Sequence, residues 1–255
     1  MPRLQKPAFS QSRELMMRIA VVSDIHGNLT AFEAVLADLR EAAPDLILHG
    51  GDLAASGSSP REVVDRIRAL GWPGVLGNTD EMLFSPEKLR LFAEQSPRFQ
   101  PLFPMVEEMA AATRAELGEE RLAWLRDLPP VQILEGLGLV HAKPGDLWRA
   151  PAPEDTDEEL ELAYGPLGRP IAVYGHIHRS FVRRTVHMTV ANSGSVSLSY
   201  DGDPRAAYLV VDESGISVRR VVYDLARELD LLRQSGLPHA DWIARTIQSG
   251  SIQMP

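Results

Sequence analysis

The sequence predicts an α/β fold in which two mixed β-sheets pack face to face with helices outside them, a four-layer α/β/β/α sandwich. Three observations support this prediction. Strand and helix patterns alternate as far as residue 76, and antiparallel strand patterns dominate the second half. The chain has 255 residues, 44% of them apolar, which is enough for a large hydrophobic core.

The first half is predicted to contain parallel strands joined by helices. Short apolar runs alternate with helical patterns whose apolar residues share one face. The short links between them favour right-handed crossovers. Ser59, Pro60 and Glu62 predict the start of the second helix, with a capping box between Ser59 and Glu62. The expected strands are 19–22, 46–48 and 74–76, and the expected helices cover 29–39 and 60–70.

A proline-interrupted helical stretch separates the two halves. Residues 81–129 follow helical patterns, and we expect an insertion beside the sheet rather than a separate domain. The second half is β-rich, and Glu135-Gly136 predicts a hairpin turn. Residues 1–16 are predicted to be a disordered extension and residues 17–255 a single domain. The expected strands of the second half are 131–134, 137–142, 171–174, 181–184, 186–190, 206–211 and 216–222.

Composition limits the classes of function. The chain has no cysteine, so a metal would be held by oxygen and nitrogen. The formal net charge of −9 argues against long nucleic acid as a partner. It leaves room for a small phosphorylated substrate, because bound cations reverse the local charge. No apolar run approaches the roughly 18 residues that a membrane span needs. No signal-peptide pattern begins the chain, so a cytoplasmic protein is expected.

Five short polar clusters follow predicted strands. In open α/β sheets ligands bind beyond the carboxyl ends of the strands, so we expect the clusters to converge on one crevice. Each cluster alone is weak, because a single Gly-Asp or a lone histidine is usually a turn or a packed residue. His176 and His178 have the spacing that would place both rings on one face of a strand. The seven candidate metal donors are Asp24, His26, Asp52, Asn78, His141, His176 and His178.

The order of these clusters resembles the calcineurin-like metallophosphoesterase family. Its pattern runs Asp-x-His, Gly-Asp, Gly-Asn-His-Asp/Glu, His and Gly-His-x-His. Additional similarity to the small bacterial and archaeal phosphodiesterase branch of the family extends the match over residues 18–212. The segments that carry this similarity are 23–28, 117–129, 192–196 and 201–206.

The resemblance implies a two-metal phosphoesterase. Two cations about 4 Å apart need a shared anionic ligand, and their field yields a bridging hydroxide that attacks phosphorus in line. Asp52, Asn78 and His141 are the expected catalytic residues. Manganese is the expected metal, with iron, zinc or nickel as alternatives. The implied ligands are Asp24, His26 and His178 for the first metal, Asn78, His141 and His176 for the second, and Asp52 for both.

Position 79 departs from the family pattern. Thr79 replaces a histidine that stabilises the substrate or protonates the leaving group, and losing an acid typically costs about 10²–10⁴ in rate. The change favours a different substrate class and leaves the general acid open. We expect Asp80 to orient a ligand histidine. After His141, Lys143 could contact a phosphate and Trp148 could stack on a base, or the lysine could be solvated and the tryptophan packed.

The predicted function is hydrolysis of small phosphoesters, phosphodiesters above all, with nucleotides as plausible substrates. One alternative is a phosphomonoesterase, protein phosphatase or dinucleoside polyphosphate hydrolase. Protein phosphatases and dinucleoside polyphosphate hydrolases usually keep the histidine that Thr79 replaces. The other alternative is a protein-binding scaffold of the same fold, which should lack several of the metal histidines. A monomer and a homodimer both remain open.

Overall fold

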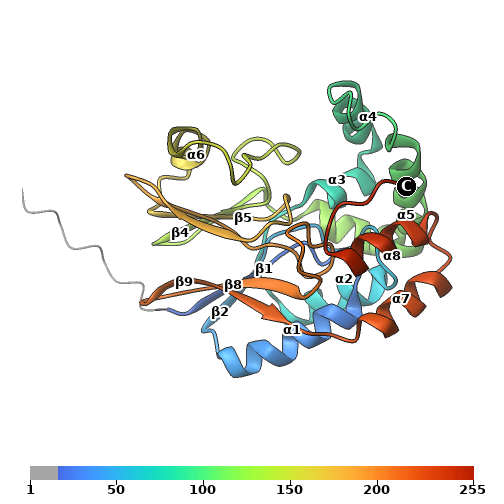
Figure 1. The fold of residues 1–255 in the computed structure, drawn as a ribbon, viewed down its shortest axis with the longest axis horizontal. Helices are drawn as coiled ribbons and strands as arrows, with labels where there is room; N and C mark the ends of the chain where they lie inside the picture. The colour runs from blue at the N-terminus through green and yellow to red at the C-terminus, as the bar shows by residue number, and fades with distance from the viewer. Residues whose placement is uncertain (1–16) are drawn as a thin grey trace, which may run out of the picture.

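The structure is a computed structural model that describes residues 17–255, so the extension expected at 1–16 lies outside the described residues. Two sheets stack between helices (Figure 1). In spatial order, the first sheet contains β2 (Leu46–His49), β1 (Ile19–Val22), β8 (Ala206–Asp212) and β9 (Gly215–Val221). The second contains β3 (Val131–Ile133), β4 (Leu137–Val140), β5 (Ile171–Tyr174), β7 (Thr189–Asn192) and β6 (Phe181–Arg184). Both sheets mix parallel and antiparallel pairs, as predicted.

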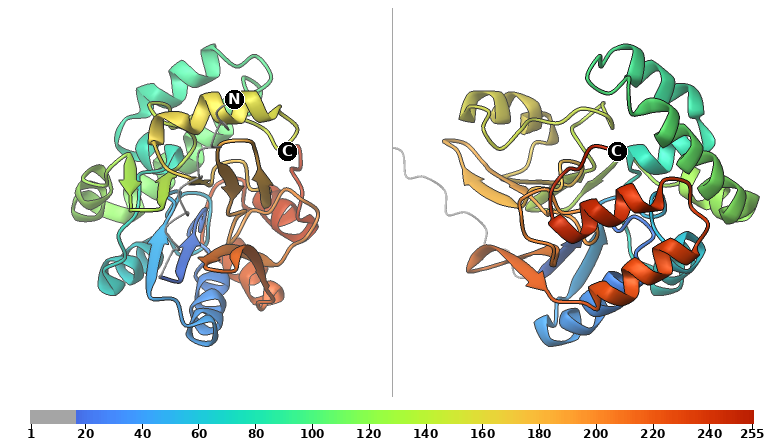
Figure 2. Two further views of the ribbon diagram at one scale, coloured as in Figure 1. Left: turned by 90° about the vertical axis from the view of Figure 1, so that its left-hand side faces the viewer. Right: turned by 45° about the vertical axis from the view of Figure 1, so that its right-hand side comes forward.

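The helices lie outside the sheets, which confirms the predicted fold class. The outer face of the first sheet is covered by α1 (Leu29–Ala42) and α2 (Pro60–Leu70), and that of the second by α6 (Asp157–Tyr164) with the 3₁₀ turn η1 (Gly165–Leu167) (Figure 1). The expected helical stretch contains α3 (Asn78–Phe84), α4 (Pro86–Glu94) and α5 (Phe103–Arg126). Near the C-terminus, α7 (Leu225–Gln234) and α8 (Ala240–Ser249) run side by side (Figure 2).

Side chains of β1 point alternately to the two faces of the first sheet and so contribute to two cores. Ala20 and Val22 belong to the core between the first sheet and its helices. Ile19 and Val21 point the other way, into the core between the two sheets. All four side chains are buried, as expected for a strand covered on both faces. The polar residues that follow β1 therefore lie at the edge of both cores.

Two expectations about the first half are wrong. Residues 74–76 form no strand, since a single bridge joins Gly74 to His49 and the Leu76 N–H donates to the Pro129 carbonyl at 2.9 Å. Ser59 is the N-cap residue of α2, but no side-chain hydrogen bond caps that helix, so the capping box is absent. The Ser59 hydroxyl instead lies 3.1 Å from the Ser58 hydroxyl.

Residues 81–129 are mostly helical, and their apolar side chains extend the core of the first sheet. Met82, Leu117 and Leu125 are buried in the same cluster as Ala20 and Val22 of β1. Their status as an insertion within one domain stays a prediction. Within residues 17–255, none of the helices combines the length and apolarity that crossing a lipid bilayer would require.

Candidate metal centre

Six of the seven predicted donors lie beyond the carboxyl ends of four strands, two from each sheet, and the seventh, Asn78, lies at the start of a helix. Because parallel strands end at a common edge, loops distant in sequence meet there. Asp24 and His26 follow β1, Asp52 follows β2, Asn78 begins α3, His141 follows β4, and His176 and His178 follow β5. Six of these residues are buried, whereas His176 is half-buried.

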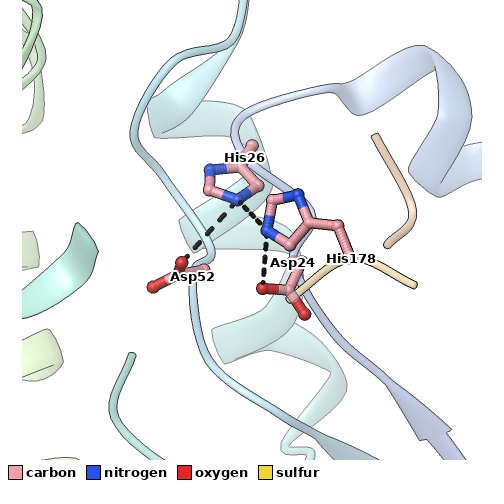
Figure 3. Close-up of side chains that lie close together, drawn as sticks. All are labelled: Asp24, His26, Asp52 and His178. Atoms are coloured by element: carbon pink, nitrogen blue, oxygen red, sulfur yellow. Dashed lines mark hydrogen bonds and ion pairs between the residues drawn. The ribbon is translucent and has the colours of Figure 1, made fainter. Parts of the chain in front are cut away.

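The first group of donors contains two carboxylates and two imidazoles. Asp24, His26, Asp52 and His178 point toward one another (Figure 3), and one ligand atom of each lies within 4.8 Å of the others. His178 Nε2 is 3.1 Å from Asp24 Oδ1 and 3.2 Å from His26 Nε2. This group contains the three residues predicted to hold the first metal.

The second group centres on the Asn78 amide oxygen, which is 2.8 Å from His141 Nε2 and 2.8 Å from His176 Nδ1. Asp52 lies between the two groups. Its Oδ2 atom is 3.4 Å from His141 Nε2 and 3.7 Å from His26 Nε2. The structure therefore brings all seven predicted donors together, with Asp52 in contact with both groups.

Backbone carbonyls orient three of the histidine rings. When Nδ1–H donates to a carbonyl, the Nε2 lone pair faces the centre. On that basis His26 Nε2 and His178 Nε2 face each other as two acceptors, which need a proton or a cation between them. The donor set thus fits a divalent cation. The bonds are His26 to Ala55 O at 2.9 Å, His141 to Gly50 O at 2.8 Å and His178 to Leu198 O at 2.6 Å.

The charges of the site shift the pKa values of its members. Burial alone would raise the pKa of Asp24 and Asp52, but neighbouring histidines hold both below their usual range. Burial alone would lower the pKa of His141, but the Asp52 carboxylate raises it to about 9. Burial and the charge of His141 lower the pKa of His176 to about 4. Both carboxylates are therefore ready to bind a cation, whereas His141 must release a proton first.

Five of the seven donors adopt a left-handed backbone. This conformation is uncommon outside glycine, although Asp and His adopt it more readily than most residues. Such residues cluster at functional sites. They also correct one expectation, because His176 and His178 lie in the loop after β5 and not on a strand. The φ angles are 57° for Asp24, 50° for His26, 55° for Asp52, 66° for His176 and 55° for His178.

Two glycines leave room for the carboxylate groups of Asp52 and Asp24. A Cβ atom at Gly77 would collide with Asp52 Oδ1, and one at Gly175 would collide with Asp24 Oδ2. Sequence reasoning did not assign them this role, although both directly precede a predicted donor. The carbonyl groups that orient the histidines had no signal in the sequence, because every residue carries one.

Asp80 supports the site in a different way from the one predicted. Its carboxylate accepts hydrogen bonds from the Leu53 N–H at 2.9 Å and the Ala54 N–H at 3.3 Å, and from no histidine among residues 17–255. Burial and the nearby charge of Asp52 raise the pKa of Asp80 to about 7. Asp80 thus holds the backbone that follows Asp52.

The expected substrate contacts after His141 are engaged in local packing. The Trp148 indole N–H donates to Glu81 Oε2 at 2.7 Å, and its ring centroid is 5.2 Å from that of Phe92. Lys143 Nζ lies 3.7 Å from Asp146 Oδ2. The phosphate and base contacts stay predictions, and the ring contact with Phe92 favours the packed alternative for Trp148.

Comparison with known proteins identifies the family. The calcineurin-like phosphoesterase superfamily domain matches residues 17–215, so the chain belongs to this superfamily and the resemblance is confirmed. An uncharacterized protein of Methanocaldococcus jannaschii is 28% identical over 258 residues, covering 91% of this chain and 98% of its own.

Two solved structures have a similar fold. The crystal structure of a metallophosphoesterase from Sphaerobacter thermophilus aligns with a TM-score of 0.72 at 25% identity, covering 92% of this chain and 99% of its own. A hypothetical protein from Pyrococcus horikoshii OT3 aligns with a TM-score of 0.76 at 19% identity and the same coverage, which shows the fold alone. The family and the buried Asp/His group together support a metal-binding phosphoesterase.

Proposed function

We propose that this protein hydrolyses small phosphodiesters, nucleotides among them, with two divalent cations. The position of Asp52 carries the proposal. One oxygen of its carboxylate lies 3.4 Å from His141 Nε2 and 3.7 Å from His26 Nε2, in contact with both groups of donors. A shared carboxylate is what two adjacent cations require. Manganese suits the mixture of imidazole, carboxylate and amide oxygen.

Each donor has a distinct task in this proposal. Asp24, His26 and His178 would hold one cation, Asn78, His141 and His176 the other, and Asp52 both. When bound, the cations would supply an activated water and offset negative charge on the phosphoryl oxygens. The carbonyls that receive the Nδ1–H groups keep the rings in place, so little reorganisation is needed when a substrate arrives.

The preference for a diester is drawn from Thr79. Its backbone N–H donates to Asp52 Oδ1 at 2.9 Å, and its hydroxyl is buried without a partner among residues 17–255. Position 79 therefore offers a substrate neither a positive charge nor an exposed proton donor. A diester carries one negative charge where a monoester carries up to two, so the diester is the better match.

Hydrolysis of bis-p-nitrophenyl phosphate and p-nitrophenyl phosphate, with manganese added, tests the proposal. We expect faster turnover of the diester, and a loss of kcat/KM on the order of 10²-fold or more in Asp52→Asn. Asparagine tolerates the left-handed backbone, so this variant removes the charge and keeps the loop. Asp65→Asn is the matched control, since Asp65 pairs on the surface with Arg121. A preference for the monoester would make the protein a phosphatase. Bound manganese without turnover of either ester would favour the scaffold.

A further inference from the structure

The loop after β7 is fastened to the first group of donors. The Ser195 hydroxyl donates to the Asp24 carbonyl at 2.8 Å. His178 Nδ1 donates to the Leu198 carbonyl at 2.6 Å, and the Tyr200 N–H donates to the His178 carbonyl at 3.0 Å. Residues 195–200 therefore form one wall of the site.

Tyr200 presents its ring to this group. The ring stacks on the His178 imidazole with centroids 4.6 Å apart and an interplanar angle of 24°. Burial and the charges of Asp24 and Asp52 raise the pKa of Tyr200, so both carboxylates act on its hydroxyl through space. Within the part of the chain that the structure describes, this hydroxyl makes no hydrogen bond, and the residue is only half-buried. The donor capacity of the phenol is thus unused.

Tyr200 and Thr79 differ in what their hydroxyl groups can reach. The Thr79 hydroxyl is enclosed by protein, so it cannot meet a substrate. The Tyr200 hydroxyl is not enclosed in this way, and the side chain is only half-buried. A tyrosine with an ordinary pKa of about 10 is neutral at pH 7 and donates one hydrogen bond.

We propose that the Tyr200 hydroxyl donates a hydrogen bond to a phosphoryl oxygen of the bound ester, a contact that position 79 cannot supply. The inference rests on the proposed function, because it requires a phosphate group at the seven donors. The phenol remains neutral, and no proton is transferred. Tyr200 thereby helps select an anionic phosphate group.

Calorimetric titration of inorganic phosphate into the manganese-loaded protein tests this role, alongside hydrolysis of bis-p-nitrophenyl phosphate. Tyr200→Phe keeps the ring and its stacking and removes the hydroxyl alone. We expect phosphate binding to weaken about tenfold and kcat/KM to fall at least as much, because hydrogen bonds to charged groups are the stronger ones. The manganese content and melting temperature should be unchanged.

Tyr208→Phe is the matched control. The Tyr208 hydroxyl donates to Asp38 Oδ2 at 2.6 Å, outside the site, so its loss should leave phosphate binding unchanged. Wild-type phosphate affinity in Tyr200→Phe would overturn the inference, as would loss of manganese from that variant or a wild-type protein that binds no phosphate. If the wild type cleaves no ester but binds phosphate in a Tyr200-dependent way, the proposed function fails and the inference stands.

Discussion

His49 and His141 are both fully buried, each at the end of a strand in a different sheet, but their pKa values are shifted in opposite directions. His49 ends β2, and within residues 17–255 neither of its ring nitrogens has a hydrogen-bond partner. Burial lowers its pKa to about 4. His141 directly follows β4 and contacts Asn78 and Asp52, and the Asp52 carboxylate raises its pKa to about 9 against the effect of burial. The two histidines are equally buried, so the difference between their pKa values comes from neighbouring charges and not from burial. These charges distinguish the histidine of the site from the histidine that is only packed.

The packing region around His49 and the site around Asp52 each depend on a glycine. A Cβ atom at Gly74 would collide with the His49 ring, whereas one at Gly77 would collide with Asp52 Oδ1. The two glycines are three residues apart on the same segment. They therefore allow the packing region and the site to be disturbed separately by the same small substitution.

The largest effect is expected from Gly77→Ala. The added methyl group displaces the Asp52 carboxylate, and a misplacement of about 1 Å can cost about 10²-fold, so we expect manganese-dependent kcat/KM to fall by that factor. Gly74→Ala should instead lower the free energy of unfolding by about 1–3 kcal/mol through overpacking and leave kcat/KM of the folded protein unchanged. Urea titration and kinetics of both variants check this. Gly165→Ala is the control, because among residues 17–255 its Cβ position meets nothing within 4 Å beyond its chain neighbours and its own helix. Equal losses of kcat/KM at positions 74 and 77 would contradict the separation of the two regions.

A smaller effect is expected from Asp80→Asn. Asparagine keeps Oδ1, which accepts from the backbone N–H groups of Leu53 and Ala54. It loses the negative charge, and an NH₂ donor replaces Oδ2, which accepts from the Leu53 N–H at 3.2 Å, so the loop after Asp52 becomes less well held. We expect manganese affinity to fall by about 10–100-fold, as for other groups that support metal ligands. Metal titration by calorimetry measures it. Unaltered affinity would show that Asp80 serves only the fold.

The smallest expected effect is the contribution of His49 to the loss of stability at acidic pH. Its folded pKa of about 4 lies below the value of about 6.5 for an unfolded histidine, so the unfolded state binds the extra proton between these pH values. The contribution of His49 to the free energy of unfolding is therefore fully present above about pH 6.5. It is lost as the pH falls, by up to about 2 kcal/mol at pH 5. In His49→Leu this contribution to the decline should vanish in urea titrations at pH 7.5 and 5, whereas the exposed His187→Gln should leave it in place. A wild-type slope in His49→Leu would assign the acid sensitivity to other groups.

The site could be predicted from the sequence more completely than parts of the fold. Carboxylates and imidazoles that follow buried strands are expected to meet where the strands end, and the order of the clusters, which resembles the family pattern, assigned Asp24, Asp52 and His141 to one centre. The left-handed backbones of Asp24 and Asp52 could not be predicted, because that conformation depends on the loops 24–28 and 50–57 packing against each other. The partners of Asp80 are backbone groups, which have no residue identity to recognise.

The failed fold predictions have both tertiary and local causes. Residues 74–76 have the apolar pattern of a strand, yet Leu76 pairs with Pro129 of a distant loop. The strand expected at 186–190 begins only at Thr189, because a turn from Thr185 to Met188 joins it to β6. The short helix α6 was not predicted, although its Thr156–Glu159 capping box is a local signal.

The left-handed backbone conformation of five donor residues limits which substitutions this centre tolerates. At Asp24, His26, Asp52, His176 and His178, a β-branched or bulky replacement would have to adopt a conformation that such residues disfavour. Asn78 and His141 have ordinary backbones and no such restriction. An effort to engineer a different metal preference therefore has more chemical freedom at these two positions, and both belong to the same half of the centre.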